Sequence, residues 1–122
     1  MAKILIEGGK PLSGSIKVSG AKNAALPIMA GVILSTEPVR LTNVPALNDV
    51  ETMAKVLQAI GIKSSCLGGN VYQFDASGPV IDEAPYELVK TMRASFFVMG
   101  PLLARLKKAR VPLPGGCAIG VR

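Results

Sequence analysis

Histidine and tryptophan are both missing from this chain of 122 residues. The absence of histidine excludes a Ser-His-Asp triad, a histidine general base and histidine metal ligands. Only two cysteines are present, Cys66 and Cys117, and they lie too far apart to form a Cys-x-x-Cys pair. The acidic residues are scattered along the chain. We therefore expect no metal and no cofactor bound by these residues.

Aromatic residues are also scarce, at 4% of the chain, so a core built from its 49% hydrophobic residues must be aliphatic. So few rings give little support to a surface that stacks the bases of nucleic acid. The net charge of +6, from 14 basic and 8 acidic residues, nevertheless favours anionic partners. Small phosphorylated ligands fit this composition better than nucleic acid does.

Long apolar runs are absent. The longest, residues 24–34, has about 11 residues, whereas a membrane-spanning helix needs about 20. The first residues lack the apolar core of a signal peptide. Two cysteines without an evident partner suit a reducing compartment. We expect a cytoplasmic protein that does not contact a membrane.

Alternating helical and extended patterns predict a protein of the α/β (α+β) class. Asn23 is the expected N-cap of the first helix, and Asn48 with Glu51 the capping box of the second, which Gly61 should end. Gly100-Pro101 should kink or split a third helical segment. Cys66 is expected to be a structural residue of a strand. The predicted elements are short strands at residues 4–6 and 15–19, a helix at 23–35, a strand at 39–43, a helix from 48, a hairpin of 62–66 and 71–75, a helical segment at 85–107 and an edge strand at 109–113.

The sequence contains a weak internal repeat. Shifted by 70 positions, residues 21–43 align without gaps on residues 91–113, so that Ala24 meets Ala94 and Arg40 meets Arg110. Both segments read as a buried helix that leads into a strand. This pattern predicts a unit used more than once, and the sequence stops where the second copy would begin its second helix. We therefore expect a truncated chain.

The repeat brings candidate site residues together. Lys22 and Asn23 begin one long helix, and Arg93 begins the matching one, while Cys117 and Arg122 lie in the glycine-rich stretch at the end of the sequence. If the strands that flank each helix are parallel, all five residues meet at one rim. Helix N-termini and cations together form an anion site, in which the pKa of a thiol would be lowered. A single lysine or arginine is, by contrast, usually just a solvated charge.

Three segments carry a family resemblance: residues 19–27, 86–95 and 113–120. They resemble the UDP-N-acetylglucosamine 1-carboxyvinyltransferases of the enolpyruvyl transferase family, and the resemblance extends over essentially all 122 residues. It implies the repeated helix-strand units of an inside-out α/β barrel, of which this chain would be a truncated N-terminal portion. Residues 1–21 would be leading strands that belong mostly to the other domain, and residues 22–122 would form a partial catalytic N-terminal domain.

The resemblance also implies an activity. The enolpyruvyl group of phosphoenolpyruvate would move to the 3-hydroxyl of UDP-N-acetylglucosamine with release of phosphate, the first committed step of peptidoglycan synthesis. Cys117 would be the catalytic acid, the residue that fosfomycin alkylates. Lys22 and Asn23 would bind phosphoenolpyruvate, and Arg93 and Arg122 would bind the UDP-sugar or the phosphates. The base and a second phosphate-binding arginine would come from the remainder of the protein's own chain, so these 122 residues alone should be inactive.

Three other interpretations stay open. A 3-phosphoshikimate carboxyvinyltransferase shares the fold and phosphoenolpyruvate, but it lacks the loop that contains Cys117. A non-catalytic module could use the same rim to bind phosphate or nucleic acid, with binding that depends on salt. An isolated fragment with unpartnered apolar helices would associate or dissolve poorly.

Overall fold

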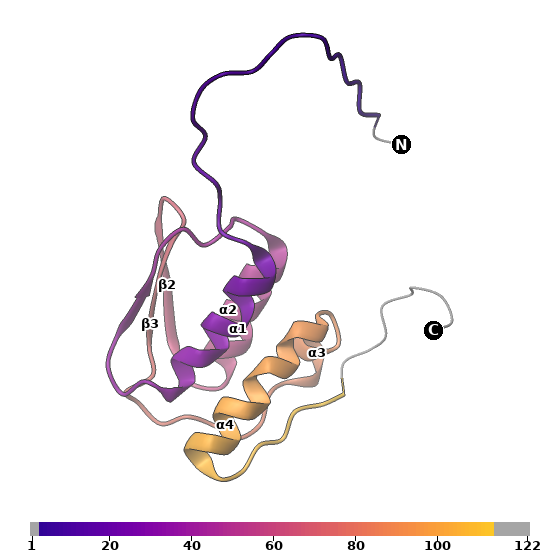
Figure 1. Ribbon diagram of the computed structural model, residues 1–122. Helices are drawn as coiled ribbons and strands as arrows, with labels where there is room; N and C mark the ends of the chain where they lie inside the picture. Colours follow the sequence, from indigo (N-terminus) through magenta and orange to yellow (C-terminus); the bar gives the residue numbers. More distant parts are fainter. Residues whose placement is uncertain (1–2, 114–122) are drawn as a thin grey trace.

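A three-stranded antiparallel sheet forms one layer of the molecule, and helices cover one of its faces (Figure 1). The computed structural model describes residues 3–113. The strands are β1 (Val39–Leu41), β2 (Lys63–Gly68) and β3 (Val71–Asp75), in the order β1-β3-β2. The fold thus has the mixed helix and strand content that the sequence predicts.

The predicted hairpin is formed by β2 and β3, with Ser65 opposite Gln73. The pairing shifts by one residue between Cys66 and Gly68, which is a bulge. The turn has φ of +81° at Gly68 and +63° at Asn70, values that glycine and asparagine tolerate better than other residues. The turn chemistry therefore favours the register of the β2–β3 hairpin.

The first helical segment consists of α1 (Lys22–Gly31) and the 3₁₀ turn η1 (Val32–Leu34). Its predicted N-cap is wrong: the helix begins one residue before Asn23, the cap position belongs to Ala21, and no side chain caps it. Its apolar surface is only partly buried, since Met29 is fully covered while Ile28 stays half exposed.

The second helix, α2 (Asn48–Ala59), begins where predicted and buries the predicted face, including Val50 and Met53. The capping box is not formed, because Leu47 occupies the cap position and no side-chain hydrogen bond is made there. Gly61 ends the helix with φ of +100°. A Cβ at Gly61 would lie 2.4 Å from the carbonyl oxygen of Pro79, so this close approach also requires glycine.

The third helical segment is split into three parts: α3 (Tyr86–Val89), the 3₁₀ helix η2 (Arg93–Val98) and α4 (Met99–Leu106). The chain leaves the helical conformation at Met92, which is extended with φ of −146°. Beside Gly100-Pro101 the helical segment is not interrupted but changes from 3₁₀ to α geometry between Val98 and Met99, so the predicted split is not formed there. The proline lies in the first turn of α4, where a missing N–H removes no intrahelical hydrogen bond.

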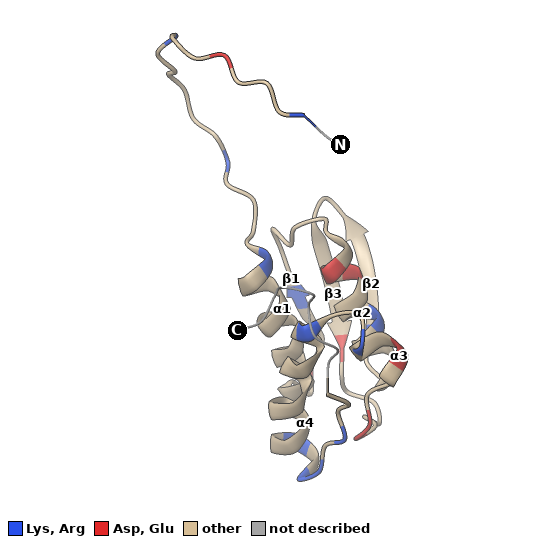
Figure 2. Cartoon of the chain, turned by 90° about the vertical axis from the view of Figure 1, so that its right-hand side faces the viewer, with Lys and Arg blue, Asp and Glu red and all other residues tan. Residues whose placement is uncertain are grey.

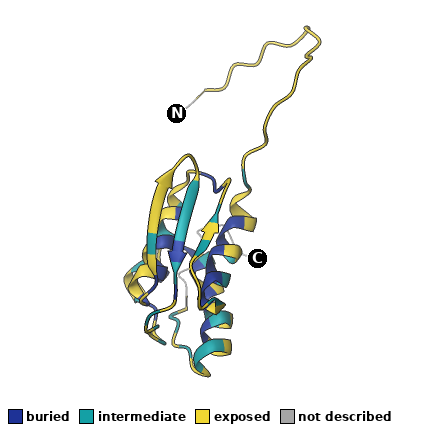
Figure 3. Cartoon of the chain, turned by 90° about the vertical axis from the view of Figure 1, so that its left-hand side faces the viewer, coloured by how far each residue is buried: buried dark blue, intermediate teal, exposed yellow. Residues whose placement is uncertain are grey.

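The core lies between the sheet and the helices (Figure 3). It is aliphatic, as the composition requires, with Phe74 of β3 as its buried aromatic residue. Its largest fully buried side chains are Phe74, Met29, Ile33, Met53, Leu57, Ile60, Ile62, Leu102, Val50, Val56, Val89 and Val98.

Three predicted strands, at residues 4–6, 15–19 and 109–113, are not formed. Residues 3–19 lead away from the sheet in Figure 1 without pairing to it, and Leu12 is 98% exposed. The region around Arg110 forms only an isolated parallel bridge with Glu83 instead of a strand over residues 109–113. A β-strand needs a neighbouring strand for its backbone hydrogen bonds, and in the described range neither region has one of sufficient length.

The internal repeat is visible in the order of the elements. Residues 21–43 contain α1, η1 and β1, and residues 91–113 contain η2, α4 and the bridge at Arg110. Each copy is a helical segment that leads into an extended one. The two copies differ in where the 3₁₀ turn lies, after the α-helix in the first copy and before it in the second.

Candidate anion-binding site

A pocket of about 270 Å³ lies where α1, α2 and η2 begin. Its lining combines two basic residues, one acidic residue, two polar residues and apolar ones, namely Lys22, Arg93, Asp49, Asn23, Thr91, Leu26, Met92 and Ala94. Three residues predicted from the sequence are therefore brought together: Lys22, Asn23 and Arg93.

Helix packing, and not the sheet, brings these residues together. The prediction relied on parallel strands that flank each helix, whereas the described sheet is antiparallel. Instead, α1 packs against both α2 and η2, and Leu26 and Met92 are buried beside the pocket. Burying these apolar side chains holds the three helix starts next to one another.

Sequence reasoning missed Asp49. Its Oδ2 lies 2.9 Å from Nζ of Lys22, and both side chains are about half exposed. Asp49 stands in the first turn of α2, where a carboxylate is favoured by the partial positive charge of the helix N-terminus. The position of Asp49 in the first turn of a predicted helix could have marked it as a candidate. The ion pair itself was not predictable, because Lys22 and Asp49 lie far apart in the sequence.

The pocket has a net positive charge, since Lys22 and Arg93 outweigh Asp49. Lys90 lies near in sequence but is engaged elsewhere: it pairs with Glu87, and that hydrogen bond raises the pKa of Lys90. The Thr91 hydroxyl donates to the carbonyl of Leu88 at 2.8 Å. Other basic residues are spread over the leading segment, β1 and the end of α4 (Figure 2). The arrangement suits a small anion better than a long polyanion.

The remaining predicted site residues, Cys117 and Arg122, lie outside the described residues. Cys66 is in β2 as predicted and forms no disulfide, but it is exposed and does not line this pocket. Cys66 is thus a strand residue, as predicted, on an exposed part of β2.

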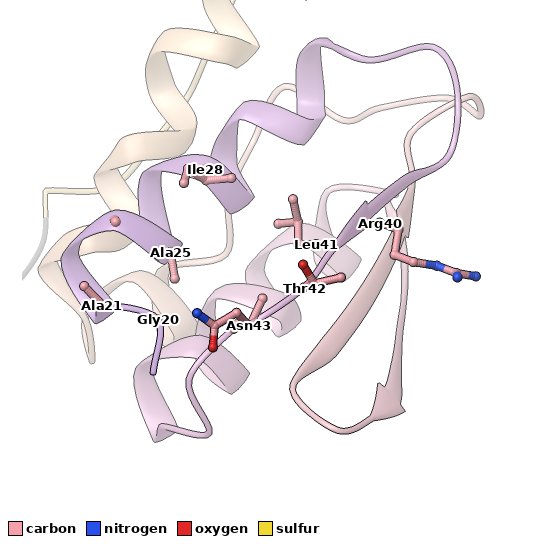
Figure 4. Close-up of a pocket in the computed structure, with 10 residues that line it drawn as sticks. Gly20, Ala21, Ala25, Ile28, Arg40, Leu41, Thr42 and Asn43 are labelled. Atoms are coloured by element: carbon pink, nitrogen blue, oxygen red, sulfur yellow. The ribbon is translucent and has the colours of Figure 1, made fainter. Parts of the chain in front are cut away.

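A larger pocket of about 400 Å³ lies between α1 and β1, but it lacks the chemistry of the first. Figure 4 shows Ala25 and Ile28 of α1 facing Leu41 of β1 across it. Arg40, the one charged residue of its lining, points away. We therefore assign the candidate site to the smaller pocket.

Within residues 3–113, histidine, cysteine and acidic side chains nowhere gather in a group of three that could hold a metal ion. In the same range, each helix is too short or too polar to cross a membrane.

Comparisons with known proteins agree with the resemblance seen in the sequence. A UDP-N-acetylglucosamine 1-carboxyvinyltransferase of Desulfovibrio desulfuricans is 55% identical over 122 residues, which is 100% of this chain and 29% of that protein. A protein of the same name from Idiomarina loihiensis is 54% identical over the same shares. The chain thus spans 29% of the length of these curated relatives.

A solved structure and a family model point the same way. The enolpyruvyl transferase NikO from Streptomyces tendae matches with a TM-score of 0.67 and 27% identity, over 80% of this chain and 23% of that one. The model of the family described as EPSP synthase (3-phosphoshikimate 1-carboxyvinyltransferase) matches residues 6–122. Because that model covers nearly the whole sequence, the chain belongs to the EPSP synthase family.

Proposed function

We propose that this chain is a piece of a UDP-N-acetylglucosamine 1-carboxyvinyltransferase, which transfers the enolpyruvyl group of phosphoenolpyruvate to that sugar nucleotide. The observation that carries the proposal is the shared pocket of Lys22, Asn23 and Arg93, two cations and an amide at the starts of packed helical segments. The names of relatives that are 54–55% identical to the chain point to the same reaction.

The reaction is an addition followed by an elimination. The 3-hydroxyl of the sugar attacks C2 of phosphoenolpyruvate and loses its proton to a base, while the methylene carbon gains a proton from an acid. The bond between C2 and the phosphate oxygen then breaks, phosphate leaves, and the methyl group returns a proton to restore the enol double bond. Negative charge on the phosphate and carboxylate groups is present throughout, so fixed cations stabilise the reacting centre.

We assign the residues of this chain by these needs. Lys22 and Asn23 bind phosphoenolpyruvate, since an ammonium and an amide both donate to phosphate and carboxylate oxygens. Arg93 and Arg122 bind the UDP-sugar or the phosphates, and Cys117 is the acid that protonates the methylene carbon. The base and a further phosphate-binding arginine belong to other parts of the protein.

The setting of the reaction follows from its substrates. Its product would enter peptidoglycan synthesis, and so affect cell shape and division, and both substrates are metabolites of the cytoplasm. Residues 1–21 are assigned to a second domain, which is supported by the lack of pairing between residues 3–19 and the sheet. The partners are then the two substrates and the rest of the protein's own chain, with no membrane or nucleic acid.

The test is phosphate release by the purified protein as its source cell produces it, after its intact mass is measured. We expect release that requires both phosphoenolpyruvate and UDP-N-acetylglucosamine, is lost in Lys22→Met, and is kept in Cys66→Ser. Shikimate 3-phosphate as the acceptor tests the activity that the family description names. Release with that acceptor alone, or no release with either, would overturn the proposal.

The thiol provides a second readout. Cys66 is exposed and serves as an internal reference. An electrophile should alkylate Cys117 well ahead of Cys66, because a thiol beside fixed cations has a larger thiolate fraction. Equal rates at both cysteines, measured by peptide mass, would remove the catalytic role from Cys117. The 122 residues expressed alone should release no phosphate above background.

A further inference from the structure

The ion pair between Lys22 and Asp49 belongs to the lining of two hollows of the surface. One of them is the candidate anion-binding pocket. The other is a hollow of about 360 Å³ lined by Lys22, Ala46, Leu47, Asn48 and Asp49. Lys22 lines both hollows, so the place of its ammonium matters for the anion-binding pocket.

The two partners differ in how firmly they are held. Asp49 has a short side chain on the first turn of α2, whose backbone is fixed by hydrogen bonds from the amides of Val50 and Glu51 to the carbonyl of Leu47, at 3.0 and 3.2 Å. The next residue, Val50, is completely buried. Lys22 has a long, flexible side chain that loses considerable conformational entropy when it is fixed. A rigid carboxylate 2.9 Å from Nζ therefore selects the position of the ammonium.

The geometry points to Asp49 as a positioning residue, which holds the Lys22 ammonium at the pocket where phosphoenolpyruvate would bind. This inference rests on the proposed function and names a residue that the proposal itself does not use. Asp49 would not touch the reacting atoms; it would act through Lys22. Without Asp49, the ammonium loses the carboxylate that lies 2.9 Å from it, and the pocket loses a cation placed by that contact.

Simple electrostatics predicts the opposite effect. Asp49 carries a negative charge at the edge of a site for an anion, so removing this charge should by itself strengthen the binding of phosphoenolpyruvate. A positioning role predicts a lower kcat/KM for phosphoenolpyruvate after the same change. The sign of the effect therefore distinguishes the two interpretations.

The experiment compares the variants Asp49→Asn, Asp49→Glu and Lys22→Met with the double variant that carries both Asp49→Asn and Lys22→Met. Each change is made in the whole protein as its source cell produces it. The measured quantity is kcat/KM for phosphoenolpyruvate at saturating UDP-N-acetylglucosamine. We expect Asp49→Asn to lower it about tenfold, Asp49→Glu to restore part of the loss, and Asp49→Asn to have no further effect in the Lys22→Met background.

Glu51→Gln is the matched control. It removes the same charge from the same first turn of α2, but Glu51 does not line the pocket. We expect its kcat/KM to stay within about twofold of the unchanged protein. A similar loss in Glu51→Gln would assign the effect to the helix start as a whole and would overturn the inference.

Two other outcomes would also overturn it. One is an unchanged or higher kcat/KM in Asp49→Asn. The other is a loss of equal size with and without Lys22, because Asp49 would then not act through the ammonium. Asp49→Ala provides a second variant if Asp49→Asn folds poorly, as judged from thermal unfolding. If Lys22→Met itself leaves kcat/KM unchanged, the proposed function fails, which is a different result from a failure at Asp49 alone.

Discussion

The guanidinium of Arg105 donates a hydrogen bond of 2.7 Å from Nη1 to the backbone carbonyl of Ile33. Its Nη2 donates to the carbonyl of Ala76 at 2.8 Å, and Nη1 also reaches the carbonyl of Ser35 at 3.2 Å. One partly buried side chain of α4 thus joins the end of η1 to the segment after β3. It ties the second copy of the repeat to the first.

Arg105→Met should destabilise the protein markedly. It leaves three partly buried carbonyl oxygens without their donor, and we expect a loss of roughly 2–4 kcal/mol in the free energy of unfolding. Arg40→Met is the matched control, because Arg40 is exposed and makes one long contact, 3.5 Å to Oε1 of Gln73. Urea unfolding measures both variants. Equal losses in the two would show that the hydrogen bonds of Arg105 contribute little.

Gly20→Ala should disturb the start of α1. A Cβ at Gly20 would lie 1.9 Å from the carbonyl oxygen of Asn43, so the backbone must shift, and Lys22 follows two residues later. We expect lower stability and a higher KM for phosphoenolpyruvate. A Cβ at Gly31, the last residue of α1, meets nothing within 4 Å, so Gly31→Ala should instead add about 0.5–1 kcal/mol. Thermal unfolding of the pair tests this difference in sign.

Acid should weaken the protein through Asp82. Its hydrogen bond with Lys108, 3.1 Å away, and the nearby Arg110 lower the pKa of Asp82 below its ordinary value of 3.8. A carboxyl with a lowered pKa in the folded state contributes stability above the unfolded pKa and loses it as the pH falls through the folded pKa. The contribution of Asp82 should therefore fade below about pH 5 and vanish at lower pH.

Lys108→Met tests this assignment, because it should raise the pKa of Asp82 toward the ordinary value and flatten the loss of stability in acid. Carbon NMR of the Asp82 carboxyl measures the pKa directly. Lys107→Met is the control, since Nζ of Lys107 contacts the carbonyl of Ala104 instead. An unchanged Asp82 titration in Lys108→Met would contradict the assignment.

Arg93→Met should lower kcat/KM, because Arg93 lines the candidate pocket. We expect kcat/KM to fall about tenfold or more for the substrate whose phosphates it contacts. Lys90→Met removes the same charge three residues away, but Lys90 pairs with Glu87 and does not line the pocket. Steady-state kinetics that vary each substrate in turn will show which one Arg93 binds. Parallel losses in both variants would indicate a general charge effect.

Sequence reasoning succeeded where local patterns decide the structure. The face of α2 that includes Val50 and Met53 was readable from helical spacing, and the β2–β3 hairpin from its glycine-rich turn. The proximity of Lys22 and Arg93 was predictable because both begin helical segments that align in the repeat.

It failed where contacts between distant residues decide. The helix caps went to Ala21 and Leu47, which offer no side-chain hydrogen bond, because packing fixes those helix starts. The break in the helical segment at Met92 was not predictable, because neither glycine nor proline lies at this position. Asp49 escaped notice because its partner Lys22 lies on another helix.

The candidate pocket lies at the seam between the two copies of the repeat, where α1 meets η2. Its two cations are carried by separate units, so the distance between them is set by the apolar layer that joins those units. Substitutions within that layer would move one charge relative to the other without replacing either. Relatives could then diverge in the ligands they prefer while inheriting the same charged residues, and ligand preference in this family would evolve partly through core packing.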